Sequence, residues 1–115
     1  MDPELRSRLI AQLRVPSPRA DMLIEMYLGN PGGIQGCQPY TSDVEAALTL
    51  LPPGVHFLCG RFEEGRRFWC DVGFRPQVQA WGDTLAAAIA GAIFTYRTEP
   101  EVASRSIGCT AGTSQ

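Results

Sequence analysis

Apolar residues near the N-terminus recur with the spacing of one helical face. The first stripe comprises Leu5, Leu9, Ile10 and Leu13. It predicts a helix over about residues 3–14, with Asp2 as its N-cap. A second stripe between residues 23 and 28 predicts another helix, with Ser17 as its N-cap. The chain is therefore expected to open with a helical pair over residues 1–28.

Glycine and proline interrupt this pattern between residues 29 and 39, which predicts a loop. After it, the segment Ser42-Asp43-Val44-Glu45 fits a capping box with Ser42 as the N-cap. A short helix rich in alanine and leucine is expected over about residues 43–51. The run Pro52-Pro53-Gly54 ends this helix, because proline cannot continue it.

Two segments, Val55–Phe62 and Arg67–Phe74, follow with the alternation of β-strands. Glu64-Gly65 predicts a two-residue turn between them. The resulting register places Cys59 opposite Cys70 in a hydrogen-bonded pair, at a Cα separation of about 5.5 Å that a disulfide allows. Because a reducing compartment is expected, free thiols are favoured over that disulfide.

Alternation along the hairpin sorts its side chains into two faces. The expected core face holds Val55, Phe57, Cys59, Phe68, Cys70, Val72 and Phe74. The opposite face holds His56, Leu58, Phe62, Arg67, Trp69 and Asp71. This second face mixes aromatic with charged groups and is too apolar to be left bare, so a cover is expected.

A third strand is expected around residues 77–81, followed by a helix with Asp83 as its N-cap. We therefore expect an α+β fold in which an antiparallel sheet of three to four strands packs against helices. The last two helices would cover the core face, whereas the N-terminal pair would cover the other face or form an oligomer contact. One domain spans residues 1–100, with an α-β-β-β-α core over 40–97, and residues 101–115 form a flexible tail.

Composition limits the classes of protein to which this chain can belong. With 115 residues it is one domain by length, and 44% apolar against 19% charged residues argues against general disorder. The net charge of −2 argues against a general DNA or RNA binder. No N-terminal signal region and no apolar stretch of membrane-spanning length is present. The expected location is therefore the cytoplasm, without membrane contact.

Patterns for catalysis and metal binding are weak. The single histidine, His56, shares a strand face with Asp71, and the two form either an acid–base pair or a surface hydrogen bond. Four cysteines without a C-x-x-C spacing do not fit a zinc site, so neither a metal nor another cofactor is expected. No G-K-[ST] phosphate loop accompanies the glycines. The protein is therefore expected not to be an enzyme.

Arginine beside aromatic residues is the stronger signal, and all ten basic residues are arginine. A planar guanidinium donates paired hydrogen bonds to phosphate or carboxylate, and an aromatic ring stacks on a base. The candidate ligand-binding residues are Arg61, Phe62, Arg67, Trp69, Arg75, Tyr96 and Arg105. Structural explanations stay open beside this one: Phe62 and Arg67 form a cation–π pair, and Trp69 covers Gly60. Arg105 lies in the tail, which either closes over a ligand or is disordered.

The segment Pro39–Gly54, PYTSDVEAALTLLPPG, resembles small bacteriophage and prophage proteins of the phage ABA-sandwich type. Those proteins have a Tyr-Thr start, an Ala-Ala-Leu helix, a Pro-x-Gly turn, strands and a closing alanine-rich helix. DTLAAAI at residues 83–89 matches the start of that closing helix, with Leu85 in place of the usual proline. The resemblance covers about residues 39–97. It implies the fold, a phage origin and the cytosol of a bacterial host, and it implies no active site.

The size and the sheet-plus-helix plan are also similar to phage-encoded Thoeris anti-defence sponges, which bind cyclic ADP-ribose isomers and related cyclic nucleotides without cleaving them. No sponge motif aligns residue by residue with this chain, so this similarity is an analogy. It implies a counter-defence protein that sequesters a cyclic nucleotide signal as a homo-oligomer, with arginines on phosphates and aromatic rings on a base. The alternative is a protein–protein inhibitor or interaction module that acts on a host protein. A concave pocket favours sequestration, and a flat patch favours a protein partner.

Overall fold

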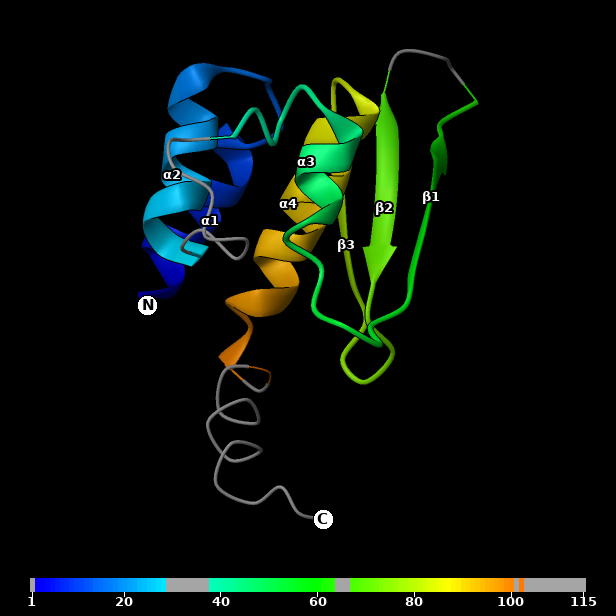
Figure 1. Cartoon of the computed structure of the whole chain (residues 1–115). Coiled ribbons are helices and arrows are strands. Elements are labelled where there is room, and N and C mark those ends of the chain that lie inside the picture. The colour runs from blue at the N-terminus through cyan, green and yellow to red at the C-terminus, as the bar shows by residue number, and fades with distance from the viewer. Residues whose placement is uncertain (1, 29–37, 64–66, 101, 103–115) are drawn as a thin grey trace.

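The computed structural model describes residues 2–28, 38–63, 67–100 and 102 (Figure 1). Its elements are α1 (Pro3–Gln12), α2 (Pro18–Leu28), α3 (Val44–Leu48), β1 (Phe57–Arg61), β2 (Phe68–Val72), β3 (Val78–Gly82) and α4 (Leu85–Arg97). These helices and the three-stranded antiparallel sheet confirm the α+β fold with an N-terminal helical pair. Outside the described residues lie positions 29–37 of the loop predicted over 29–39, the Glu64-Gly65 turn and, apart from residue 102, the predicted tail.

The elements stack in three layers, with α4 in the middle (Figure 1). The sheet has the order β1-β2-β3 and packs mainly β2 and β3 against one side of α4. The helical pair of α1 and α2 lies on the other side of α4, away from the sheet. The expectation that this pair covers the second sheet face is therefore wrong. The expectation for α3 is also wrong, because α3 packs against α4 rather than on the sheet.

The composition of α4 explains this arrangement. Residues 86–94 of α4 are buried without a break, so no side of the helix is suited to solvent. The sheet covers only one side of it, and the helical pair and α3 cover others. As a result, no described helix packs on the sheet face that points away from α4.

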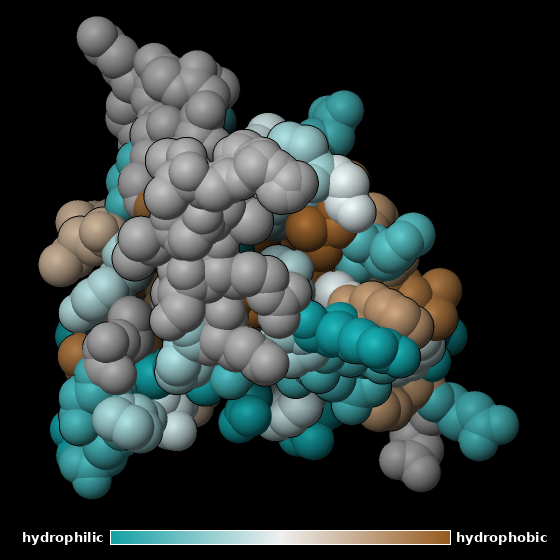
Figure 2. All heavy atoms as spheres, turned by 90° about the horizontal axis from the view of Figure 1, so that it is seen from below, coloured by the Kyte–Doolittle hydropathy of each residue, from teal (hydrophilic) through white to brown (hydrophobic). Residues whose placement is uncertain are grey.

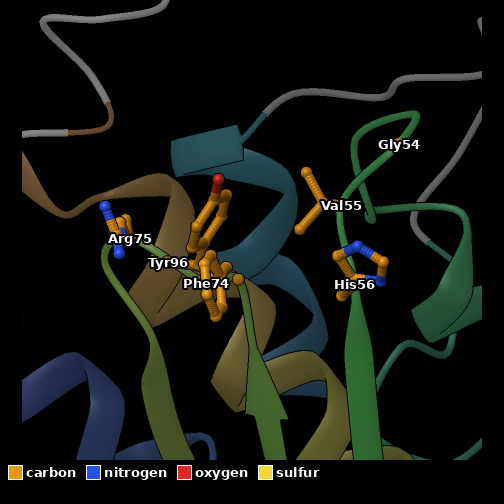
Figure 3. A pocket seen from close by; sticks show the side chains of 7 residues that line it. Gly54, Val55, His56, Phe74, Arg75 and Tyr96 are labelled. Atoms are coloured by element: carbon orange, nitrogen blue, oxygen red, sulfur yellow. The ribbon is translucent and has the colours of Figure 1, made fainter.

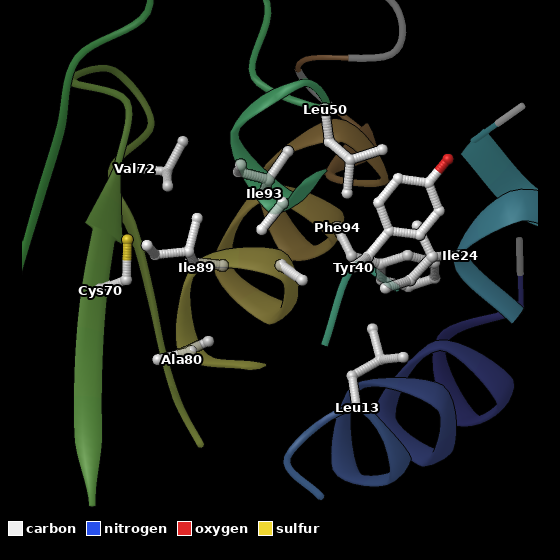
Figure 4. Packing of buried hydrophobic residues seen from close by; sticks show 14 of the residues in the cluster. Leu13, Ile24, Tyr40, Leu50, Cys70, Val72, Ala80, Ile89, Ile93 and Phe94 are labelled. Carbon is white, nitrogen blue, oxygen red and sulfur yellow. The ribbon is translucent and has the colours of Figure 1, made fainter. Parts of the chain in front are cut away.

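The hydrophobic core continues through α4 from the sheet to the helical pair (Figure 4). On the sheet side it includes Cys70, Val72, Ala80 and Ile89. On the side of the helical pair it includes Leu13, Ile24, Tyr40 and Phe94. The Tyr40 hydroxyl group donates a hydrogen bond to a Glu25 carboxylate oxygen at 2.8 Å, so this buried ring keeps a partner for its polar end.

Two phenylalanines that are expected in the core are exposed. The exposed fraction is 41% for Phe57 and 71% for Phe74. Phe57 belongs to the edge strand β1, which α4 covers less than it covers β2 and β3. Phe74 lies beyond the end of β2. Strand alternation predicts the side of the sheet on which a residue lies, but it does not predict how far the covering helix extends.

The strand register agrees with the prediction and pairs Cys59 with Cys70. The positions of the hydrogen-bonded pairs differ from the prediction, because His56 and Gly73 form one of them: the Gly73 N–H donates to the His56 carbonyl at 2.9 Å. Since hydrogen-bonded pairs alternate along the ladder, Cys59 and Cys70 form a non-hydrogen-bonded pair, typically with Cα atoms about 4.5 Å apart. Both are free cysteines. Burial raises the pKa of the Cys70 thiol to about 12, with smaller contributions from Cys59 and Asp71.

The first two helix caps are as expected. Asp2 accepts a hydrogen bond from a first-turn N–H of α1, and Ser17 does the same for α2. The N-cap of α3 is Asp43 rather than Ser42. The Ser42 N–H donates to the Pro39 carbonyl at 3.0 Å, so Ser42 belongs to the preceding turn and the helix begins one residue later than expected.

The N-cap of α4 is Thr84 rather than Asp83. Thr84 Oγ1 accepts a hydrogen bond from the Ala87 N–H at 3.0 Å and donates one to the Thr41 carbonyl at 3.0 Å. The Asp83 N–H instead donates to the Arg14 carbonyl at 2.9 Å, which ties the start of α4 to the turn between α1 and α2. A cap that serves two partners at once explains why the threonine takes this position.

Candidate functional site

The sheet face that points away from α4 carries a cluster of aromatic and basic side chains. We call this cluster the Trp–Arg patch, and its members are Arg14, Phe62, Arg67, Trp69 and Trp81. Strand pairing places Trp69 directly opposite Trp81, and the neighbouring Leu58 is 64% exposed. The patch therefore lies toward the end of the sheet where β1 finishes and β2 begins.

Trp81 is the centre of the Trp–Arg patch. The guanidinium carbon of Arg14 lies 4.4 Å from the centroid of the Trp81 ring, and that of Arg67 lies 4.6 Å from it. Arg67 therefore stacks on Trp81, and the cation–π contacts among the described residues do not include the alternative pair of Arg67 with Phe62. A cation–π contact is worth about 0.5–1 kcal/mol at an exposed site such as that of Arg67, and it restricts the orientation of the guanidinium N–H groups.

Trp69 covers Gly60, as one of the structural explanations predicts. A Cβ atom placed on Gly60 would lie 2.7 Å from Cζ2 of the Trp69 ring, closer than real side-chain contacts. The indole ring therefore lies directly against the β1 backbone. One of its faces is used for this contact, which leaves less of the ring for stacking on a ligand.

The positive charge of the patch has no internal counter-ion among the described residues. The ion pairs of the described chain join Arg6 to Glu99 at 3.1 Å and Arg8 to Glu4 at 3.2 Å, and neither involves Arg14 or Arg67. In addition, Nε of Arg14 is buried without a hydrogen-bond partner. Within the described part of the chain, two guanidinium groups thus share one indole ring, and neither of them forms an ion pair. An external anion would relieve their mutual repulsion.

A shallow pocket lies at the opposite end of the sheet (Figure 3). It has a volume of about 260 Å³ and is lined by Gly54, Val55, His56, Gly73, Phe74, Arg75 and Tyr96. Gly73 has a φ of 86°, and a Cβ atom there would overlap the Tyr96 ring, so glycine lets α4 approach the strand closely. The Arg75 guanidinium lies 5.4 Å from the centroid of the Phe74 ring.

Figure 2 views the molecule from this lower end, and apolar surface there lies beside strongly polar surface on the part drawn in colour. Figure 3 shows Phe74, Arg75 and Tyr96 on one side of the pocket, and Val55 and His56 on the other. The pocket therefore offers one guanidinium and two aromatic rings to a small ligand. Its volume is below the roughly 300–1,000 Å³ of typical ligand pockets.

The structure divides the predicted ligand-binding residues between these two places. Phe62, Arg67 and Trp69 belong to the Trp–Arg patch, whereas Arg75 and Tyr96 line the pocket. The five residues of β2 separate the two places by roughly 17 Å, at about 3.3 Å per residue. The predicted residues therefore do not form one site within a single copy of the chain.

Two predicted residues belong to neither place. Arg61 ends β1 on the same side as Cys59, so alternation directs it toward the α4 side of the sheet. Arg105 lies outside the described residues. Sequence analysis also missed Arg14, which reaches Trp81 from the turn between α1 and α2. Because this contact joins residues far apart in the chain, no local pattern points to it.

The described residues contain no group of three or more His, Cys, Asp or Glu side chains that could hold a metal ion. Asp71 accepts a hydrogen bond from the Gln77 side chain at 3.2 Å through Oδ2, while its Oδ1 is buried without a partner. No hydrogen bond joins His56 to Asp71 in the described chain, so the geometry contains neither the acid–base pair nor the surface hydrogen bond. None of the described helices is long and apolar enough to cross a membrane.

Comparisons with protein-family models, with curated proteins and with solved structures found no match for this chain.

Proposed function

We propose that this chain is a non-catalytic binding protein that attaches through its Trp–Arg patch to an acidic surface of another protein. The observation that carries this proposal is the stacking of Arg14 and Arg67 on the single ring of Trp81. The phage origin implied by the resemblance makes a bacterial host protein the expected partner. The chain would then act as an inhibitor or interaction module for that protein.

The shape of the patch supports a protein partner over a small ligand. The patch lies on the face of an antiparallel sheet, with no described helix packed over it, whereas small-ligand sites bury most of their ligand in a cleft. Tryptophan and arginine are also the residues that most often dominate the energy of protein–protein contacts. An open surface that combines both is typical of the centre of such a contact.

The charge of the patch supports an acidic partner. Arg14 and Arg67 lack a carboxylate among the described residues, although each presents a planar set of donors. Carboxylates of a partner that bind these guanidinium groups would satisfy their donors and reduce their repulsion. Stacking fixes the arginines beforehand, so less side-chain entropy is lost on binding.

Intrinsic fluorescence tests this proposal directly, because Trp69 and Trp81 are the two tryptophans of the chain and both lie in the patch. The probe is poly-L-glutamate, added at low salt to the wild-type chain and to two charge-matched variants. The variant Arg14→Gln/Arg67→Gln removes the patch charge. The control Arg8→Gln/Arg19→Gln removes two exposed arginines of the helical pair.

We expect the probe to change the tryptophan emission of the wild type and the control, with an affinity that falls as salt rises. The patch variant should bind at least about tenfold more weakly, the equivalent of about 1.4 kcal/mol. The same variants then serve in capture of bacterial proteins, where loss should again be specific to the patch variant. An equal response of both variants, or no response of the wild type at low salt, would contradict the proposal.

Sequestration of a cyclic nucleotide is the second candidate, and the pocket is the specific observation that favours it. Arg75 and Tyr96, both predicted ligand residues, lie there beside Phe74. Arg75 would contact a phosphate, and an aromatic ring would stack on a base. At about 260 Å³ one pocket holds part of such a ligand, so this function needs an oligomer that completes the site.

A thermal-shift screen with cyclic dinucleotides and cyclic ADP-ribose isomers tests this second candidate. A ligand at 100 times its dissociation constant adds about 2.7 kcal/mol to the stability. The shift should be lost in Arg75→Gln and kept in Arg67→Gln, and chromatography should recover the ligand intact. A shift that depends on Arg67 would move the nucleotide to the Trp–Arg patch, and a cleaved ligand would indicate an enzyme.

A further inference from the structure

One edge of the sheet is open to pairing. In the order β1-β2-β3, β1 has a single partner strand, and Figure 1 shows no described element on its outer side. The alternation of hydrogen bonds along the strand determines which backbone N–H and C=O groups of β1 do not bond to β2. The Phe62 N–H donates to the Arg67 carbonyl at 3.0 Å, and the Gly73 N–H donates to the His56 carbonyl at 2.9 Å. Even-numbered residues of β1 therefore bond to β2.

The odd-numbered residues of β1 direct their backbone N–H and C=O groups outward. These residues are Phe57, Cys59 and Arg61. An exposed row of this kind pairs with another strand unless proline, a bulge or charges block it. The strand Phe57–Arg61 contains no proline and pairs with β2 without a bulge, and its one charged residue is the last.

The other edge strand of the sheet, β3, has a neighbour beside it. Just beyond β3, the Asp83 N–H donates to the Arg14 carbonyl, and the Arg14 side chain crosses to Trp81 on β3. The turn between α1 and α2 therefore lies beside β3, whereas β1 has no comparable neighbour among the described elements.

We propose that β1 pairs antiparallel with β1 of a second copy of this chain, across a two-fold axis at Cys59. This axis passes through the middle of the strand, so all five residues from Phe57 to Arg61 are paired. All three outward-facing residues of each strand then exchange hydrogen bonds with the other copy. Two three-stranded sheets become one continuous sheet, with α4 on the same face in both copies.

The side chains of β1 complement one another in this register. On the α4 side, Phe57 of each copy lies opposite Arg61 of the other, which suits a cation–π contact. On the open face, Leu58 lies opposite Gly60, so a large side chain meets an empty position. Trp69 already lies over Gly60 and would contact the incoming Leu58. The pairing therefore buries Phe57 and Leu58, which are 41% and 64% exposed in a single copy.

Self-pairing is favoured over an unrelated peptide by this complementarity. The contrasting positions lie at equal distances on either side of Cys59: Phe57 mirrors Arg61, and Leu58 mirrors Gly60. An antiparallel two-fold contact therefore places Phe57 opposite Arg61 and Leu58 opposite Gly60 in a single register. This inference does not depend on the proposed function, since it requires neither an acidic partner nor a nucleotide.

Sedimentation velocity tests the proposal, with loading from roughly 5 to 500 µM to cover the dissociation constants of small interfaces. Leu58→Glu places a carboxylate at the new contact, and Met26→Glu makes the same kind of change at an exposed α2 residue. Arg61→Pro removes an outward N–H, and Arg61→Ala retains it. Circular dichroism and thermal melting check that each variant is folded.

We expect the wild type and Met26→Glu to convert from monomer to dimer as concentration rises. Leu58→Glu should weaken the dimer at least about tenfold, and Arg61→Pro should weaken it more than Arg61→Ala does. A wild type that stays monomeric at the highest concentration overturns the proposal. A dimer that is equally strong in Leu58→Glu and Arg61→Pro overturns it too, because that dimer would use another surface.

Discussion

Two glycines at the contact between α4 and the sheet should respond to the same substitution with opposite signs. A Cβ atom on Gly91, inside α4, would lie 3.6 Å from Cβ of Ala80 and 4.0 Å from Cβ of Leu13. These are ordinary van der Waals distances. A Cβ atom on Gly82, at the end of β3, would lie 2.7 Å from the backbone nitrogen of Ala88. Backbone inside a helix cannot move aside without breaking its hydrogen bonds.

The expected magnitudes follow from these distances. Alanine in a helix interior is more favourable than glycine by about 1 kcal/mol, and a buried methyl group adds up to about 0.8 kcal/mol. Gly91→Ala should therefore raise the free energy of unfolding by about 1 kcal/mol or slightly more. Gly82→Ala forces the sheet and α4 apart and should lower it by about 1–3 kcal/mol. The corresponding changes in Tm are about 4 °C per kcal/mol for a chain of this size.

Urea unfolding, followed by far-ultraviolet circular dichroism, measures both changes in free energy. Gly54→Ala is a useful control, because Gly54 has a φ of 79° but no atom within 4 Å of an added Cβ. It should cost only the backbone strain, about 1–2 kcal/mol. If Gly91→Ala destabilised the protein, or if Gly82→Ala were neutral, the close fit of α4 on β3 would be refuted.

Three further substitutions test contacts that hold the layers together. Asp21→Ala should lower the free energy of unfolding in urea by about 3 kcal/mol, because buried Asp21 accepts the Thr41 N–H at 2.8 Å and its hydroxyl at 2.7 Å. Thr84→Ala should cost about 1–2 kcal/mol in the same assay, with Thr84→Ser as a control that retains the cap. The pKa of Cys70 is raised from 9.0 to about 12, so the folded state holds a proton that the unfolded state releases between these values. Stability should therefore fall from pH 9 upward by at most about 1.4 kcal/mol per pH unit, and a pH-dependent unfolding series should show this slope disappear in Cys70→Ala.

Sequence patterns predicted those parts of the fold that depend on near neighbours. Stripes and breaks predicted α1 and α2 to within about two residues, and the hairpin register was correct at every pair of β1 with β2. The N-caps of α3 and α4 were each misplaced by one residue. Asp43 and Thr84 took these positions because their neighbours were held by Pro39 and Arg14, contacts that a propensity argument does not include.

The order of the layers could not be predicted in the same way. Alternation identified the two faces of the hairpin correctly but could not show that the helical pair would cover neither of them. That arrangement depended on α4, whose alanine-rich surface is buried on the side away from the sheet as well. The apolar stripe of Leu85, Ala88, Ile89, Ala92, Ile93 and Tyr96 predicts one packed face of this helix, to be buried on a sheet. The alanines outside that stripe are buried as well, which the stripe does not predict.

In the candidate site, too, sequence patterns identified residues that are close in the chain and missed contacts between distant ones. Phe62, Arg67 and Trp69 were found because they lie close together on one hairpin. Arg75 was included because it flanks the predicted third strand, and Tyr96 because an aromatic ring can stack on a base. The length of β2 places both at the other end of the sheet. Arg14 was missed because its contact with Trp81 crosses from the helical pair to an edge strand.

The burial of α4 also explains why the Trp–Arg patch is available. An antiparallel sheet with one solvent-facing side usually carries polar residues there, in strict alternation with the core. This sheet instead carries Trp69 opposite Trp81, with Leu58 exposed beside them. The helical pair, the cover expected for such a surface, packs on α4 instead. Because the helical pair packs on α4, two tryptophans remain on an open sheet face, which is the surface that the proposed partner would cover. Arg14 and Arg67 form no ion pair among the described residues, so under this proposal they would contact acidic groups of that partner.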